Sequence, residues 1–125
     1  MLNKQSPSVQ IYRFPITALT SIATRISGFA LSGCFVTTGM YHLTQPTKVT
    51  STLQSAYDDL PDSTKTIAKY SLIFPACYHT LGGMRHYIWD AYPKIFINNA
   101  YATKSSYLLI GTSVVGTFLL QRFKN

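Results

Sequence analysis

Between Arg25 and Lys48 the sequence reads ISGFALSGCFVTTGMYHLTQPT (residues 26–47) and carries no formal charge. A bilayer core about 30 Å thick is crossed by about 20 residues of helix, at about 1.5 Å per residue. This stretch is therefore long enough to span a membrane by itself. It predicts a first transmembrane helix at about 21–44.

Two shorter intervals, 70–84 and 105–121, also contain no Asp, Glu, Lys or Arg. Each becomes long enough to span a membrane if the flanking lysines and arginines extend toward the lipid headgroups. We therefore expect two further helices at about 64–89 and 104–122. The predicted fold class is all-α, an integral membrane protein with three transmembrane helices. The alternative, a soluble three-helix bundle, is disfavoured because the spans lack a polar face.

The composition supports the membrane assignment and argues against nucleic acid. Charged residues make up 12% of the 125-residue chain and hydrophobic residues 46%, whereas a globular chain has about 25% charged residues. Eleven Lys and Arg against four acidic residues give a net charge of +7, which suggests a polyanion, an acidic partner or a membrane surface. No two basic residues are adjacent, unlike the clusters of nucleic-acid-binding proteins. Cys34 and Cys77 lie in apolar stretches, without the spacing of a disulfide framework or a metal site.

The distribution of Lys and Arg among the connecting segments predicts the orientation of the chain. Segment 1–20 and the connection between the second and third helices hold the excess, which places both on the inner side. We expect a polar loop at 45–63 and a short tail at 123–125 on the outer side, with Asp62 or Ser63 as the N-cap of the second helix. The N-terminus shows no presequence pattern, so we expect that an import signal was removed or never existed.

His79 lies well inside the second span, where a neutral imidazole needs a hydrogen-bonded neighbour or a metal. Gly82 and Gly83 lie about one turn further on, so the surface beside His79 has room for a flat macrocycle such as haem, whose iron binds a neutral histidine nitrogen. His86 lies about 10 Å further along the helix, so a second histidine ligand has to come from another chain. On these residues alone, His79 is either a haem ligand or a histidine bonded to a neighbouring helix.

Other polar residues fall near the inner ends of the first two spans. Arg85 and His86 suit the cationic or hydrogen-bonding partners of haem propionates, and the alternative for Arg85 is a membrane anchor that extends toward the headgroups. Ser21 and Arg25 are four residues apart and share a helix face. Their hydroxyl and guanidinium groups suit a quinone carbonyl, and the positive charge favours the reduced, anionic forms. A helix start with a headgroup anchor is the alternative for this pair.

Two motifs resemble the signatures of one protein family. The segment SIATRISG (residues 21–28) resembles S-I-x-H-R-x-[S/T]-G, and the segment HTLGGMRHYIWD (residues 79–90) resembles H-x-x-x-G-x-R-H-x-x-W-D. Both signatures belong to the large cytochrome b560 membrane-anchor subunit of succinate dehydrogenase, respiratory complex II, and the mitochondrial type is the closer match. Ser6-Pro7 and Ile11-Tyr12 also resemble the leading segment of that family. The resemblance covers most of the chain in the right order.

This resemblance implies a set of roles. His79 is the axial ligand of haem b, and the second axial histidine comes from the small anchor subunit. Ser21 and Arg25 line the ubiquinone pocket, while Arg25, His86 and Gly83 belong to the haem surroundings. No residue of this chain is catalytic, and the chain serves a succinate dehydrogenase that passes electrons to quinone and links the tricarboxylic acid cycle to the respiratory chain.

The resemblance also implies partners and a location. The expected partners are the small cytochrome b anchor subunit, the iron–sulfur subunit, the flavoprotein subunit and membrane lipid, and nucleic acid is not among them. The expected location is the mitochondrial inner membrane, with several spans and the N-terminus in the matrix.

Thr24 departs from the family pattern, because it stands where the family has a histidine associated with the haem propionates and the quinone pocket. The departure affects the propionate contacts and leaves the axial position unchanged. Two alternatives follow. One is a divergent or haem-less structural subunit, and the other is the anchor of a complex that runs as a fumarate reductase with a low-potential quinone.

Overall fold

The computed structural model describes residues 13–45, 48–96 and 98–122. Three long helices make up most of it: α1 (Ile16–Thr44), α3 (Asp62–Ala91) and α5 (Asn99–Arg122). Two short helices join them, α2 (Val49–Asp58) and α4 (Pro93–Phe96). The described residues contain no strand, which confirms the predicted all-α class. The expected leading residues Ser6-Pro7 and Ile11-Tyr12 and the tail 123–125 lie outside the described residues.

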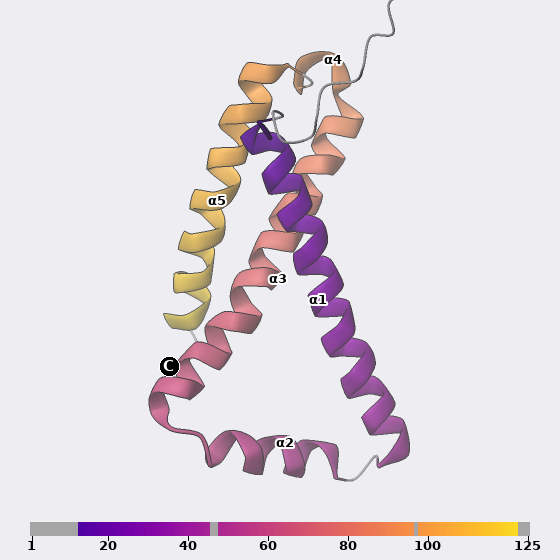
Figure 1. The fold of residues 1–125 in the computed structure, drawn as a ribbon, viewed down its shortest axis with the longest axis vertical. Coiled ribbons are helices and arrows are strands. Elements are labelled where there is room, and N and C mark those ends of the chain that lie inside the picture. The colour runs from indigo at the N-terminus through magenta and orange to yellow at the C-terminus, as the bar shows by residue number, and fades with distance from the viewer. Residues whose placement is uncertain (1–12, 46–47, 97, 123–125) are drawn as a thin grey trace, which may run out of the picture.

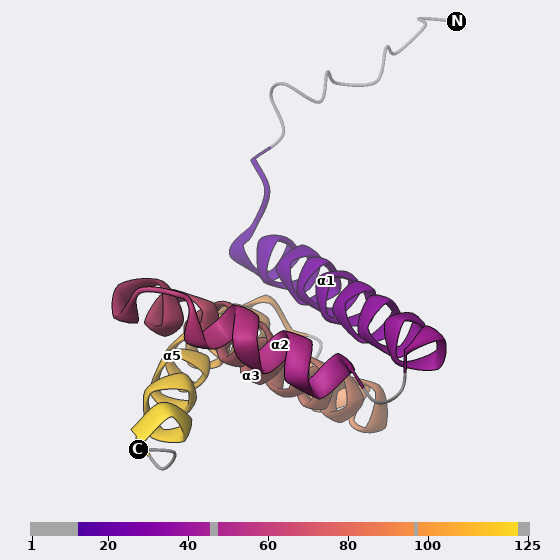
Figure 2. The same ribbon diagram turned by 90° about the horizontal axis from the view of Figure 1, so that it is seen from below.

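The α3 helix lies between α1 and α5 and packs against both. Figure 1 shows α1 and α3 close together near the start of α1 and well apart at the other end, where α2 connects them. Figure 2, the view from below, shows α1 and α5 on opposite sides of α3. The start of α1, the short α4 helix and the start of α5 gather at one end of the molecule (Figure 1).

The three long helices occupy the predicted segments and extend beyond them. The first begins at Ile16 rather than near residue 21, because Pro15 takes the N-cap position with an extended backbone (φ −66°, ψ 153°). The Pro15 carbonyl accepts hydrogen bonds from the N–H groups of Ala18 at 3.0 Å and Leu19 at 3.2 Å. These bonds close the first turn inside the segment that was expected to lead into the helix.

The prediction that Asp62 or Ser63 caps the second long helix is wrong. Pro61 is the N-cap of α3, without a side-chain cap hydrogen bond, and Asp62 is the first helical residue. The Pro61 carbonyl accepts a hydrogen bond from the N–H of Lys65 at 3.0 Å. A proline has the φ angle that a helix start needs, and an acidic residue in the first turn interacts favourably with the helix dipole.

The expected outer loop at 45–63 contains a helix, α2, that sequence analysis missed. It runs across the direction of the long helices, between the end of α1 and the start of α3 (Figures 1 and 2). Its apolar signal is short, with Leu53 and Tyr57 four residues apart among hydroxyl and amide side chains. Ten residues with so few apolar positions are read as a loop when only the sequence is considered.

Among the described residues, only α1 is long and apolar enough to cross a membrane by length and hydropathy. Its most apolar 18-residue window has a mean hydropathy of 1.3. The α5 helix is interrupted by hydroxyl side chains, but several of these bond carbonyls of their own helix, as Ser113 does to Leu109 at 2.6 Å and Thr117 to Ser113 at 2.7 Å. Such bonds reduce the cost of a hydroxyl in lipid. Membrane crossing by α3 and α5 stays a prediction.

The side chains buried between the helices are mostly small and polar, while most large apolar side chains are exposed. Only Tyr78 and Leu109 are buried hydrophobic residues in the described part of the chain. The buried polar residues are Thr20, Thr24, Arg85, Ser106, Ser113 and Thr117. Phe29 is 84% exposed and Leu43 is 83% exposed. Helices that pack within a lipid bilayer show this pattern, with small and hydroxyl residues between the helices and apolar residues outside.

One buried side chain connects all three long helices. Arg85 of α3 donates from Nη1 to the hydroxyl of Thr20 on α1 at 3.2 Å and to the hydroxyl of Ser106 on α5 at 3.0 Å. The Thr20 hydroxyl also lies 3.2 Å from that of Ser106, and the Tyr78 hydroxyl donates to the Thr20 carbonyl at 3.3 Å. These bonds hold the start of α1 and the start of α5 against the second half of α3.

The contact of α1 with α3 at Gly82 provides a test of how these helices pack. A Cβ atom at this position would lie 2.5 Å from the Oγ1 atom of Thr24 and 2.6 Å from its Cγ2 atom. We expect Gly82→Ala to push the helices apart and to lower the free energy of unfolding by about 1–3 kcal/mol. Unfolding of the chain in detergent micelles measures this loss.

The matched control is Gly33→Ala on α1, where a Cβ atom would meet no other atom within 4 Å. This variant should be at least as stable as the parent chain, because alanine favours a helix over glycine. Equal stability of the Gly82 and Gly33 variants would contradict the predicted close contact.

Candidate functional site

His79 lies where α3 meets α1, and its ring is bonded to the α1 backbone. Its Nδ1 atom lies 2.9 Å from the carbonyl oxygen of Thr24. A carbonyl oxygen can only accept a hydrogen bond, so Nδ1 carries the proton and the lone pair of the neutral ring lies on Nε2. This bond gives His79 the neighbouring-helix partner that one of its two expected roles requires. It also leaves Nε2 as a free ligand atom, which the other role requires.

The glycines near His79 have separate roles, and one expectation needs correction. Gly28 of α1 lies directly against the His79 ring, and a Cβ atom there would collide with it. Gly82, which was expected to leave room for a macrocycle beside His79, packs against Thr24 instead. Gly83 is exposed, and a Cβ atom there would meet no atom within 4 Å. The open surface therefore lies on the His79 and Gly83 side of α3.

The structure brings together two candidates that the sequence placed in separate clusters, Ser21 and His86. The Oγ atom of Ser21 on α1 lies 3.3 Å from the Nε2 atom of His86 on α3. Both side chains are half-buried. The His86 ring also meets the edge of the Trp89 ring, with 5.5 Å between their centres. This hydroxyl–imidazole pair can hold a proton between its two heteroatoms.

Arg25 lies one turn after Ser21 on α1 and is exposed. It makes no hydrogen bond or ion pair within the part of the chain that the structure describes. The guanidinium group is therefore free to meet a ligand or a partner chain beside the Ser21–His86 pair. Ser21 and Arg25 were predicted to share a helix face. Both lie in the continuous helix α1, where residues four apart lie on the same face.

Arg85 is not the exposed residue that its expected roles describe. It was expected to reach haem propionates or lipid headgroups at the inner end of the span, but it is only 7% exposed and bonds Thr20 and Ser106 between the helices. Neither Thr20 nor Ser106 was among the site residues predicted from the sequence. The arginine itself could have indicated such partners, because a cation within a membrane-spanning segment needs hydroxyl or acidic groups on facing helices.

Thr24 contributes its backbone to the site more than its side chain. Its carbonyl accepts the bond from His79, while its buried hydroxyl donates to the Thr20 carbonyl of its own helix at 2.9 Å. The side chain fills the space against Gly82. No group of three or more His, Cys, Asp or Glu side chains suited to a metal ion occurs in the described residues.

Comparison with known proteins identifies the family. The model of the succinate dehydrogenase/fumarate reductase transmembrane subunit family matches residues 2–120. The succinate dehydrogenase cytochrome b556 subunit of Paracoccus denitrificans is 37% identical over 112 residues, which cover 88% of this chain and 82% of that protein.

Mitochondrial relatives are similar as well. The cytochrome b560 subunit of succinate dehydrogenase from Mus musculus is 33% identical over 99 residues, or 74% of this chain. The cytochrome B subunit from Schizosaccharomyces pombe is 27% identical over 119 residues, or 92% of this chain. The chain covers 59% and 66% of the lengths of these two relatives. On the family match and the similarity to the Paracoccus subunit, the chain belongs to the succinate dehydrogenase/fumarate reductase transmembrane subunit family.

Proposed function

We propose that this chain is the membrane-anchor cytochrome b subunit of a succinate:quinone oxidoreductase and contributes to haem b ligation and ubiquinone binding. The observation that carries the proposal is the hydrogen bond from His79 Nδ1 to the Thr24 carbonyl, at 2.9 Å. It orients an exposed imidazole and leaves the Nε2 lone pair unused, and a metal-ligating histidine is commonly fixed by such a bond on its other nitrogen. The relatives are named cytochrome b560 and b556 subunits, and these names support haem b as the bound group.

The residues of this chain fit one side of a haem. His79 would bind the iron through Nε2, and the open surface at Gly83 would lie beside the macrocycle. His86 is bonded to Ser21 and lies two turns away, so a second histidine ligand would come from the small anchor subunit. Arg25 and His86 would meet the propionates through charge or hydrogen bonds. Haem, when bound, carries one electron at a time.

The alternative of a haem-less subunit was raised by Thr24, and the geometry argues against it. The bond that orients His79 comes from the backbone carbonyl at position 24, which every amino acid supplies. The threonine side chain faces Gly82 instead. The ligand position therefore does not depend on the histidine that the family has at this place.

The quinone would lie beside Ser21 and Arg25. The Ser21 hydroxyl can donate a hydrogen bond to a quinone carbonyl and accept one from His86 Nε2, which lies 3.3 Å away. The Arg25 guanidinium would stabilise negative charge that develops on the quinone oxygen. The remaining walls would come from the iron–sulfur subunit and the small anchor subunit, and the flavoprotein subunit would supply the electrons of succinate.

The complex could run in either direction, as a succinate dehydrogenase or as a fumarate reductase. The matched family includes fumarate reductase subunits by name, so the same anchor with a low-potential quinone would serve a fumarate reductase. We favour succinate oxidation, because the curated relatives described above are named for succinate dehydrogenase.

His79 provides a direct test of haem ligation. We expect His79→Leu to abolish or shift the b-type absorption bands of the purified complex, because it removes the Nε2 ligand. The matched control is Thr24→Val, which keeps the carbonyl and the shape of the side chain and should keep the bands. An unchanged spectrum in His79→Leu would refute the ligand assignment.

Arg25 provides a test of quinone binding. We expect Arg25→Ala to lower quinone reduction at least about tenfold, because it removes a charged partner of the quinone oxygen. Succinate oxidation by artificial dyes should stay near its normal rate, because the dyes accept electrons before the quinone site. The control is His42→Ala at the other end of α1, which should leave quinone turnover unchanged. Normal quinone turnover in Arg25→Ala would contradict the proposed pocket.

The proposed location is the mitochondrial inner membrane with the N-terminus in the matrix, and cysteine labelling tests the orientation. Ser51 on α2 and Lys94 on α4 are both exposed, and α2 and α4 lie at opposite ends of the long helices (Figure 1). In mitoplasts, a membrane-impermeant maleimide should label Ser51→Cys directly and Lys94→Cys only after permeabilisation. The reverse pattern would overturn the orientation, and labelling of both residues in sealed mitoplasts would overturn the three spans.

A further inference from the structure

Arg85 carries a buried positive charge that no acid of this chain balances. The four acidic residues of the chain are all described, and the one ion pair among the described residues joins Lys65 to Asp62. Arg85 uses Nη1 for its bonds to Thr20 and Ser106. Its Nε and Nη2 atoms are buried and have no hydrogen-bond partner in the described part of the chain. A buried charge with unused donors is costly unless an anion reaches it.

The two unused donors form one edge of the guanidinium group. An N–H of Nε and an N–H of Nη2 point in parallel, and this fork matches the two oxygens of a phosphate or carboxylate. The opposite donor, Nη1, is already held by hydroxyls of α1 and α5. Arg85 is therefore fixed on one side and prepared for an oxyanion on the other.

Arg85 lines a cleft of about 380 Å³ between α3 and α5. The other walls are mostly apolar and include Met84, Ile88, Trp89, Phe96 and Leu108. The guanidinium carbon lies 4.5 Å from the centre of the Trp89 ring. A cleft with one cation, aromatic residues and a long apolar wall fits an amphiphile with an anionic head better than a small soluble anion.

The charges around this end of the molecule favour an anionic lipid. Lys94 on α4 and Lys104 on α5 are exposed, and Asp90 is the acid at this end of α3. Phe96, two residues after Lys94, and Ser105, the residue after Lys104, line the cleft. Basic residues close to a membrane surface attract acidic phospholipids. We propose that the α3–α5 cleft binds one anionic phospholipid, with its phosphate on the Nε and Nη2 edge of Arg85 and an acyl chain along Leu81, Met84 and Leu108.

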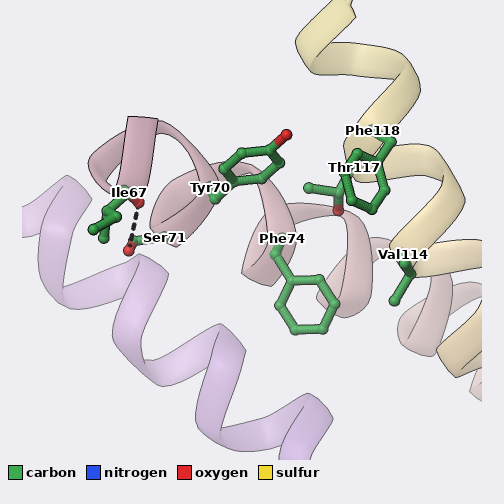
Figure 3. A pocket seen from close by; sticks show the side chains of 7 residues that line it. All are labelled: Ile67, Tyr70, Ser71, Phe74, Val114, Thr117 and Phe118. Atoms are coloured by element: carbon green, nitrogen blue, oxygen red, sulfur yellow. Dashed lines mark hydrogen bonds between the residues drawn. The ribbon is translucent and has the colours of Figure 1, made fainter. Parts of the chain in front are cut away.

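A second groove between α3 and α5 offers a natural control. Figure 3 shows this groove, of about 420 Å³, with the side chains of Tyr70, Ser71, Phe74 and Phe118 on its walls. The Tyr70 and Phe118 rings meet edge to face, with 5.8 Å between their centres. No Lys, Arg or acidic residue lines it. It lies between the same two helices but has no group that would hold an anionic head.

The experiment is lipid binding to the complete purified complex, measured by native mass spectrometry after exchange into phosphatidylglycerol or phosphatidylcholine. The parent complex should retain one more phosphatidylglycerol than phosphatidylcholine. Ser105→Phe fills the Arg85 cleft from α5 and should abolish this retention. Ser71→Phe fills the groove of Figure 3 and should leave it unchanged. Arg85→Gln should weaken it at least about tenfold, because the charged fork is lost.

The outcomes separate the proposal from its competitors. Equal retention of the two lipids would show an apolar groove only and would overturn the role of Arg85. Retention that survives Ser105→Phe would place the lipid elsewhere and overturn the proposed cleft. Displacement of the lipid by inorganic phosphate alone at millimolar concentration would overturn the need for an acyl chain. If Arg85→Gln fails to assemble because its bonds to α1 and α5 are lost, the comparison of Ser105→Phe with Ser71→Phe still decides the question.

Discussion

The hydrogen bond from His79 to the Thr24 carbonyl is the interaction on which the candidate site depends. It requires α1 and α3 to approach closely, which glycine permits on both helices: Gly28 faces the His79 ring and Gly82 faces Thr24. The bond then determines which ring nitrogen is free. Two turns further along α3, the same pair of helices brings His86 to within 3.3 Å of Ser21. One helix contact therefore positions both the proposed haem ligand and the proposed quinone residues.

The rest of the structure follows from a polar interior and an apolar surface. The described chain buries hydroxyl groups and one arginine between its helices and exposes large apolar side chains such as Phe29 and Leu43. Hydrogen bonds between helices in lipid contribute about 0.6–2 kcal/mol each, and small residues add close packing. Arg85 makes two such hydrogen bonds, because its Nη1 atom donates to hydroxyl groups of α1 and α5. Its unused donors also make it the point where a ligand from the membrane would complete the interior.

Sequence analysis predicted the three long helices because charge spacing and helix rise are local properties of the chain. It also placed Ser21 and Arg25 on one helix face, and His79 in the interior of a span. It could not predict that Ser21 meets His86, because the rotation and shift of one helix against another depend on packing. For the same reason Gly82 was assigned to the wrong neighbour. Arg85 could be recognised as unusual, but its partners on facing helices could not be identified from spacing within one helix.

The most direct test of the central contact is the protonation state of the His79 ring. ¹⁵N NMR spectra of the histidine-labelled complex in its reduced form, compared with those of His79→Leu, isolate the signals of this residue. The contact predicts a proton on Nδ1, where the Thr24 carbonyl accepts it, and none on Nε2. A His79 ring with its proton on Nε2 and a bare Nδ1 would contradict the hydrogen bond and, with it, the proposed haem ligand.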